Sequence, residues 1–306
     1  MKKTAVVFPG QGAQAVGMGK DLVEAVPEAM EWFARASEVL GFDLAKVCFE
    51  GPAEELTRSD RAQPAIFVHS VVAYELLKAR TDLVPVAAGG LSSGEWAALY
   101  AAGVVTFEDA LRILRVRGEA MQAACEMEKS GMVSIIGLAD DKIEVICKEL
   151  DIQVANYNSP GQTVVSGKAD AVAKVPEMAK AAGAKLAVPL PVAGAFHSRL
   201  MAPAEKIFAD FLQDISLSAP AFPVAANVTG GMHTDVAGIR ADMPRQITGS
   251  VRWVENVGAL IGHGVNCVVE CGPGKVLTGL VKRIDKSIEL HNVSDIASLE
   301  KVVASL

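Results

Sequence analysis

One short segment combines the residue types of an activated serine: Gly90-Leu91-Ser92-Ser93-Gly94 fits the pattern G-x-S-x-G. A serine hydroxyl is a poor nucleophile at its free pKa, so it must be presented to a base and to its substrate. A sharp turn from a strand into a helix does this, because it exposes the hydroxyl and the glycines leave room for the turn. Free N–H groups at the start of the helix can stabilise an oxyanion. The segment therefore predicts Ser92 as a nucleophile, although an ordinary glycine-rich loop has the same pattern.

A nucleophilic serine requires a base, and the chain offers five histidines: His69, His197, His233, His263 and His291. We expect His69 to be a packed side chain, because it lies in an apolar stretch with a helical pattern. The three histidines beyond residue 200 have polar or glycine-rich neighbours, which indicates surface positions. His197 follows the segment 189–196 and precedes a new helix, so a loop can deliver its imidazole from one domain to a serine on another. Position alone leaves this assignment open.

Two further signals are weak by themselves. Arg117 lies on a predicted helix that also carries Arg112 and Arg115, and by position a solvated basic face is the simpler interpretation. Gly10-Gln11-Gly12 follows the first predicted strand, where a backbone N–H can lie near the serine.

The apolar pattern predicts the elements that position these residues. Residues 4–8 and 83–88 are short apolar runs followed by turn residues, which indicates buried strands. A helix of small residues is predicted from 93 to 102, with Gly103 ending it. Further helices are expected over 27–40 and from Pro64 to Leu77, and a late buried strand at 268–269. The alternation of strand, glycine turn and helix indicates an α/β fold.

The middle of the chain has a different pattern. Strands are predicted over 132–138, 152–157, 162–166 and 185–190, with helices over 141–150 and 169–182. This β-α-β-β-α-β order is that of the ferredoxin-like split unit. We therefore expect a small subdomain at 128–193, inserted into a larger α/β subdomain formed by 1–127 and 194–306.

Composition narrows the class of protein. Of the 306 residues 51% are hydrophobic and the net charge is −7, which favours a globular chain and argues against nucleic acid as the main partner. The five cysteines are widely spaced and form no CxxC pair, so neither a disulfide framework nor a metal site is indicated. The first residues run directly into the strand at 4–8, and no stretch approaches the length of a membrane span. A cytoplasmic protein without membrane binding is expected.

Taken together, these segments resemble the malonyl-CoA:acyl-carrier-protein transacylase family of fatty-acid synthesis. The resemblance covers nearly the whole chain, and several blocks in the same order are much more specific than any one of them. The blocks are Phe8 to Gln14, Gln63 to Ala65, Gly90 to Glu95, Arg117-Gly118 with Met121-Gln122, Asn156 to Gln162, Phe196 to Ser198 and Gly272 to Leu277. The resemblance implies an α/β-hydrolase-like core with a parallel sheet that carries the ferredoxin-like insert.

The resemblance implies a ping-pong transfer through an ester on Ser92. His197 would be the base, and a backbone carbonyl of Ser250 or Arg252 would orient its imidazole in place of the usual carboxylate. Malonyl would pass from malonyl-CoA to Ser92 and then to the pantetheine thiol of acyl carrier protein. Such a cycle needs no metal and no redox cofactor.

The resemblance also implies a substrate pocket. Backbone N–H groups of Gln11 and Ser93 would form the oxyanion hole, and Gln11, Leu91 and Phe196 would contact the substrate. Arg117 would bind the free malonyl carboxylate, since a planar guanidinium can grip a carboxylate through two parallel charge-assisted hydrogen bonds. Leu91 stands where the family usually has histidine, which removes a polar contact near the substrate entrance.

Two other functions are weighed beside this one. A trans-acting acyltransferase or acyl hydrolase of a polyketide pathway would share the nucleophile and the base. A non-catalytic module that binds carrier proteins would need a broken dyad, whereas Ser92 and His197 are both present. An acidic carrier protein requires a local basic patch, for which Lys275, Lys282 and Arg283 are candidates, although a solvated helix face is the simpler interpretation. We expect a monomer.

Overall fold

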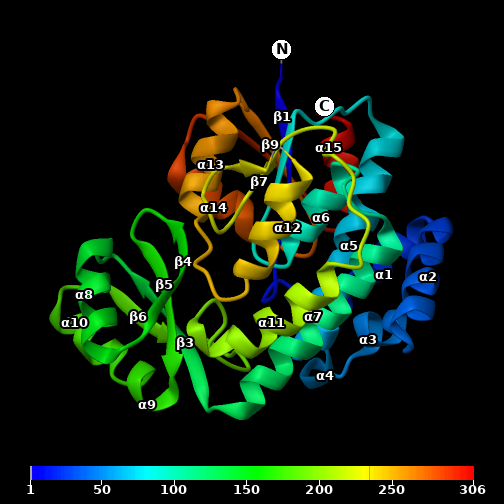
Figure 1. Ribbon diagram of the computed structural model, residues 1–306. Helices are drawn as coiled ribbons and strands as arrows, with labels where there is room; N and C mark the ends of the chain where they lie inside the picture. The colour runs from blue at the N-terminus through cyan, green and yellow to red at the C-terminus, as the bar shows by residue number, and fades with distance from the viewer. Residues whose placement is uncertain (1, 234) are drawn as a thin grey trace.

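The computed structural model describes residues 2–233 and 235–306, and it contains two sheets (Figure 1). The larger sheet has the order β10-β9-β1-β2-β7-β8. Its strands are β1 (Thr4–Phe8), β2 (Ala87–Gly90), β7 (Val224–Ala225), β8 (Met232–His233), β9 (Cys267–Cys271) and β10 (Glu289–Val293). The described pairs are parallel except for β7 with β8. The prediction of an α/β-hydrolase-like core with a parallel sheet is confirmed.

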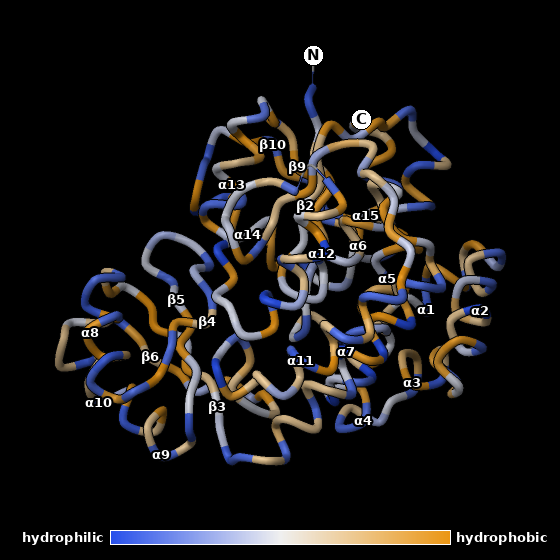
Figure 2. The backbone as a smooth tube through the Cα atoms, viewed as in Figure 1, coloured by the Kyte–Doolittle hydropathy of each residue, from blue (hydrophilic) through white to orange (hydrophobic). Residues whose placement is uncertain are grey.

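Successive side chains of β1 point to opposite faces of this sheet, and the hydrophobic core therefore has two parts, one on each face. Val6 and Phe8 pack against one layer of helices, and Ala5 and Val7 pack against the other. The first layer includes α2 (Met30–Leu40), α5 (Ser59–Arg80), α6 (Gly94–Ala101), α7 (Phe107–Met127) and α15 (Ile296–Val303); the second includes α13 (Trp253–Gly262) and α14 (Val276–Ile284). Figure 2 shows hydrophobic residues concentrated in the central strands and hydrophilic ones on the outer ends of the helices. Burial of both faces is what parallel strands require.

The remaining helices of the larger part surround this core. They are α1 (Lys20–Ala25), the 3-10 turn Pro27–Ala29, α3 (Leu44–Glu50), α4 (Ala53–Thr57), the 3-10 turn Arg199–Met201, α11 (Ala202–Leu212) and α12 (Val236–Arg245). The helix expected from Pro64 begins earlier, at Ser59. Pro64 removes one N–H donor, but most of α5 is buried and its packing outweighs that loss.

The second sheet is antiparallel and has the order β4-β5-β3-β6. Its elements are β3 (Ser130–Ile136), α8 (Asp140–Leu150), β4 (Gln153–Ser159), β5 (Gln162–Lys168), α9 (Ala169–Val172), α10 (Val175–Ala181) and β6 (Leu186–Pro189). This order and pairing confirm the ferredoxin-like prediction. The single helix expected over 169–182 is divided, because Pro176 lacks the N–H that would continue it. The sheet lies within the insert expected at 128–193, whose boundaries stay a prediction.

Backbone hydrogen bonds join the small sheet to the larger part of the chain. The Val251 N–H donates to the Ala155 carbonyl at 2.8 Å, and the Tyr157 N–H donates to the Val251 carbonyl at 2.9 Å. This contact places β4 beside the segment that links α12 to α13. The small sheet thereby forms one wall of a cleft, and the loop after β1, the turn after β2 and α14 form the other.

Among the described residues, none of the helices combines the length and the apolar character that a membrane span needs.

Candidate active site

Ser92 occupies the turn between β2 and α6, and its backbone has the left-handed φ of 55°. This conformation is uncommon for residues other than glycine and occurs mostly where the surrounding structure enforces it. The flanking glycines allow the turn, because a Cβ on Gly94 would lie 2.3 Å from the Phe8 carbonyl oxygen and one on Gly90 would lie 2.0 Å from the Gly94 oxygen. The strand-turn-helix context predicted around Ser92 is present.

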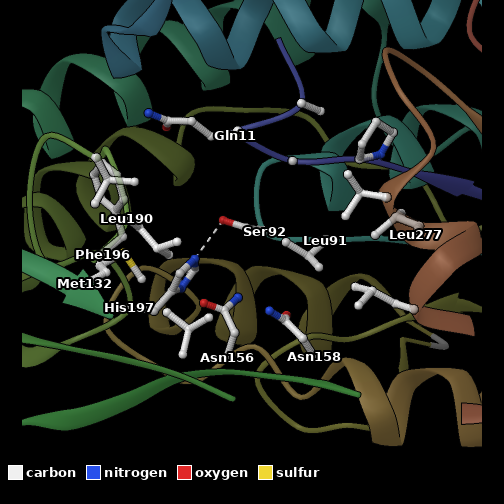
Figure 3. Close-up of a pocket in the computed structure, with 18 of the residues that line it drawn as sticks. Gln11, Leu91, Ser92, Met132, Asn156, Asn158, Leu190, Phe196, His197 and Leu277 are labelled. Carbon is white, nitrogen blue, oxygen red and sulfur yellow. Dashed lines mark hydrogen bonds between the residues drawn. The ribbon is translucent and has the colours of Figure 1, made fainter. Parts of the chain in front are cut away.

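His197 meets Ser92 across the cleft, from the segment between β6 and α11. Its Nε2 lies 2.8 Å from Ser92 Oγ (Figure 3). Like Ser92, it has a left-handed φ, of 56°. The Nδ1–H donates toward the carbonyl oxygens of Gln246 at 2.8 Å and Gly249 at 3.1 Å. These bonds fix the tautomer in which Nε2 carries the lone pair that faces the serine hydroxyl.

The carbonyl expected from Ser250 or Arg252 is therefore supplied by Gln246 and Gly249, so that prediction is wrong. Gln246 directly follows α12. Backbone carbonyls at the end of a helix are free to accept other hydrogen bonds, because no further helical turn supplies N–H groups to them. The Arg252 carbonyl instead accepts from the Asn256 N–H in the first turn of α13. The segment at Ser250 is tied to β4, because its hydroxyl donates to the Val154 carbonyl at 2.6 Å.

The imidazole of His197 is 3% exposed, and burial lowers its pKa. The positive charge of Arg117 lowers it further, and the two carbonyl hydrogen bonds oppose the shift. The resulting pKa is about 4. His197 is therefore neutral near pH 7 and able to accept the Ser92 proton.

Arg117 is fully buried, which corrects the interpretation of its helix as a solvated basic face. It donates to Gln63 Oε1 at 2.7 Å, to Gln246 Oε1 at 3.0 Å and to Ser92 Oγ at 3.2 Å. Its Nε is buried and has no hydrogen-bond partner within the described chain. Burial lowers its pKa to about 10, against the opposing effect of Glu95, so the guanidinium stays charged. A charged guanidinium beside Ser92 that still has an N–H free to donate suits an anionic substrate group.

The loop after β1 closely approaches the Ser92 turn. A Cβ on Gly10 would lie 2.2 Å from the Leu91 carbonyl oxygen, so glycine is needed there. Figure 3 places Gln11 and His197 on either side of Ser92. The Gln11 side chain donates to Ser59 Oγ at 3.2 Å. Across the described residues, the backbone N–H groups of Gln11 and Ser93 have no protein acceptor, which suits them to an oxyanion.

A cavity of about 240 Å³ extends from Ser92 between the two sheets. The large subdomain contributes residues 9–13, Leu91, Val276, Leu277 and Leu280, and the other wall consists of Met132, Asn156, Asn158, Gln162, Val164, Leu190, Val192, Phe196 and His197. Leu91 and Phe196, which were predicted to contact the substrate, line this cavity, and Leu91 offers it an apolar side chain. A cavity this narrow suits a short acyl group on a slim arm.

A buried polar network beneath Ser92 was not predicted. Asn227 Oδ1 accepts the Ser92 N–H at 2.6 Å, and Glu95 accepts from the Asn227 N–H, from Gln246 and from His233. His233 is 3% exposed, so its expected surface position is wrong. These residues come from α6, β8 and the segments after β7 and α12, and no spacing along the sequence connects them. By contrast, the prediction that His69 is packed is confirmed.

One group of side chains outside the cleft has the residue types of a metal site. Cys267, Glu289 and His291 place their ligand atoms within 4.8 Å of one another on β9 and β10. Glu289 Oε1 already contacts Lys2 Nζ and His291 Nε2, each at 2.8 Å. The carboxylate therefore already has two protein hydrogen-bond partners, and this group lies away from Ser92.

The α/β fold, with a serine, a histidine and a buried arginine in contact in one cleft, is that of an acyltransferase. A family model for the acyl transferase domain matches residues 5–302, and the chain belongs to this family. Among its relatives, the malonyl CoA-acyl carrier protein transacylase of Escherichia coli (strain K12) is 42% identical over 288 residues, 93% of each chain. That of Bacillus subtilis (strain 168) is 39% identical over 311 residues, covering 100% of this chain and 98% of the relative.

Solved structures agree with this assignment. An acyl carrier protein S-malonyltransferase from Vibrio cholerae superposes with a TM-score of 0.94 at 42% identity, covering 98% of this chain and 100% of that one. A malonyl-transacylase in complex with its type II PKS acyl-carrier protein gives a TM-score of 0.96 at 39% identity, with both chains fully covered.

Proposed function

We infer that this chain transfers a malonyl group from malonyl-CoA to the phosphopantetheine thiol of an acyl carrier protein. The observation that carries this conclusion is the convergence on one hydroxyl: Ser92 Oγ lies 2.8 Å from His197 Nε2 and 3.2 Å from an Arg117 nitrogen. The named activities of the relatives support it.

In the first half-reaction, His197 Nε2 takes the Ser92 proton as Oγ attacks the thioester carbonyl. The backbone N–H groups of Gln11 and Ser93 stabilise the tetrahedral oxyanion. Collapse of this intermediate breaks the carbon–sulfur bond. His197 gives its proton to the leaving thiolate, so coenzyme A departs as a thiol. In the second half-reaction, His197 deprotonates the carrier thiol, which attacks the ester and regenerates the Ser92 hydroxyl.

Arg117 is the proposed determinant of the acyl group. A malonyl carboxylate would replace the contact between the guanidinium and Ser92 Oγ and would engage the unpaired Nε. An acetyl group leaves this buried charge without an ionic partner, and such a loss discriminates strongly. The apolar contacts of Leu91 and Phe196 are the same for both acyl groups.

We place the transfer in fatty-acid biosynthesis. The polyketide alternative retains support, because one 39% identical relative was solved with a type II PKS carrier protein. Exposed Lys275 directly precedes α14, and exposed Lys282 and Arg283 lie in its last turn. Because α14 lines the cavity, these residues remain candidates for contact with an acidic carrier. The cytoplasmic location, the monomeric state and the absence of a cofactor stay predictions.

Covalent labelling tests the function. The protein is incubated with radiolabelled malonyl-CoA or acetyl-CoA, and the label on the chain is counted for wild type, Ser92→Ala and Arg117→Ala. Ser93→Ala is the matched control for the nucleophile, and Arg112→Ala, an exposed arginine paired with Asp109, is the control for the anchor.

We expect malonyl label on wild type and both controls, and none on Ser92→Ala. Arg117→Ala should lose malonyl label about a hundredfold while keeping its small acetyl label. Equal labelling of wild type by the two donors would contradict malonyl selectivity. Transfer of label to carrier proteins purified from the two pathways decides between fatty-acid and polyketide synthesis.

A further inference from the structure

Glu95 is a buried carboxylate shared by donors from three segments. Its Oε1 lies 2.7 Å from His233 Nε2, and its Oε2 accepts from Gln246 Nε2 at 2.6 Å and from the Asn227 N–H at 3.2 Å. Glu95 is 1% exposed and His233 3% exposed. A carboxylate this deeply buried requires both hydrogen bonds and a compensating charge.

This carboxylate fixes the orientation of the Gln246 amide. An ionised carboxylate accepts hydrogen bonds and cannot donate them, so the NH₂ end of the amide must face Glu95. The amide oxygen therefore faces Arg117 and accepts from it at 3.0 Å. The same NH₂ group donates to the Ser92 carbonyl at 3.0 Å, and the Gln246 backbone carbonyl holds His197 Nδ1 at 2.8 Å. One glutamine thus contacts the nucleophile, the base and the anion anchor.

The charge of Glu95 reaches Arg117 through this amide. Its negative field stabilises the charged guanidinium, which is the sense in which Glu95 raises the pKa of Arg117. The same field opposes the approach of a second anion to Arg117. A positive charge on the far side of Glu95 cancels this effect, and His233 occupies that position.

The surroundings of His233 favour its charged form. Three carboxylates face it: Glu95, Asp242 with Oδ2 at 3.9 Å from Nδ1, and Asp235. The other oxygen of Asp242 is paired with Arg245 at 3.1 Å. Burial lowers the pKa of His233, but the hydrogen bond to Glu95 and the three negative charges outweigh it, and the pKa is raised above 6.5.

We propose that protonated His233 is a positioning residue for malonyl recognition: it takes up the charge of Glu95, so that Gln246 holds Arg117 through a neutral oxygen and the guanidinium charge stays available to the substrate carboxylate. This inference rests on the proposed function, since it concerns how Arg117 meets a malonyl group. It assigns His233 no contact with the substrate.

Steady-state kinetics of His233→Gln test the proposal, because glutamine keeps a donor toward Glu95 and removes the charge. We expect the KM for malonyl-CoA to rise about tenfold, the size of effect that one unit charge has from roughly 12 Å at an effective dielectric of about 20. The kcat for malonyl and the kinetics with acetyl-CoA should change less than about twofold. The double variant Glu95→Gln/His233→Gln removes both charges and should recover most of the lost malonyl affinity. His69→Gln, a buried histidine outside this network, is the matched control.

A wild-type measurement keeps the proposal testable if a variant fails to fold. As pH rises above 6.5 through the raised pKa of His233, its charge is lost, so the KM for malonyl-CoA should rise while that for acetyl-CoA stays flat. A flat malonyl KM, or a His233→Gln enzyme with the wild-type KM, overturns the proposal. A double variant no better than His233→Gln also overturns it, because packing would then explain the loss. Failure of the wild type to accept malonyl from malonyl-CoA would instead refute the proposed function.

Discussion

Replacing Arg117 with glutamine is expected to change the pH dependence of Ser92 acylation. The acid limb of the pH–rate profile, where the rate falls as the pH drops, should move to higher pH. Burial and the charge of Arg117 together lower the pKa of His197 to about 4. An Arg117 nitrogen lies 3.2 Å from Ser92 Oγ, which in turn lies 2.8 Å from His197 Nε2. Removing the guanidinium removes its repulsion of the imidazolium and leaves the burial in place. The pKa of His197 should therefore rise toward its ordinary value.

The size of the effect follows from this geometry. Two unit charges roughly 6 Å apart interact by about 3 kcal/mol at an effective dielectric of about 20. Since about 1.4 kcal/mol corresponds to one pKa unit, the substitution should raise the pKa of His197 by about two. The acid limb then moves from below the usual assay range into it.

The assay uses a neutral ester, p-nitrophenyl acetate, because its acyl group makes no ionic contact with Arg117. The rate of Ser92 acylation is measured from about pH 4.5 to 8 and falls where His197 becomes protonated. Wild type should lose little rate above about pH 5.5, whereas Arg117→Gln should lose half of its rate near pH 6. Arg117→Lys, which keeps the charge, should behave like wild type. Identical acid limbs for wild type and Arg117→Gln would refute the electrostatic argument, as would an Arg117→Lys enzyme that follows Arg117→Gln.

Three further outcomes follow from the buried groups around the site. Burial lowers the pKa of His69 from 6.5 to about 4, so the unfolded chain takes up this proton at a higher pH than the folded chain, and the free energy of unfolding should fall as the pH drops from 6.5 to about 4. Urea denaturation of His69→Leu should show a smaller fall over this pH range, and a fall equal to that of wild type would contradict the argument. Gly94→Ala would bring a Cβ to 2.3 Å from the Phe8 carbonyl oxygen, and this clash should destabilise the fold by about 2 kcal/mol or more. Thermal unfolding measures this loss, and a variant with the Tm of wild type would argue against so close an approach of the turn to β1. Asn227→Ala removes the acceptor 2.6 Å from the Ser92 N–H and should slow acylation about tenfold in a burst assay, whereas a wild-type burst would show that the turn holds without it.

Local sequence was sufficient to predict the turn that holds Ser92. The glycines around Ser92 are required by backbone distances within one strand-turn-helix unit, so their spacing in the chain already indicates the turn. The ferredoxin-like order was predictable for a similar reason, because strand and helix periods are local. The helix expected from Pro64 began too late, since a proline signal is local and the packing that overrides it is not.

The surroundings of Ser92 and His197 depend on contacts that the spacing of residues along the chain does not predict. Arg117 looked like one of several exposed basic residues, yet it is buried and touches Ser92. His233 looked like a surface residue, yet it pairs with Glu95. The carbonyls that orient His197 come from Gln246 and Gly249, a few residues before the predicted ones.

The sequence by itself determined the fold class, the strand-turn-helix context of Ser92 and, through several matching blocks, the histidine and arginine that meet it. The tertiary structure decided which charges are buried, which carbonyls meet the imidazole and how one glutamine joins all three groups. The physical reason is that burial and hydrogen-bond partnership depend on elements far apart in the chain: Glu95 and His233 are 138 residues apart and meet at 2.7 Å.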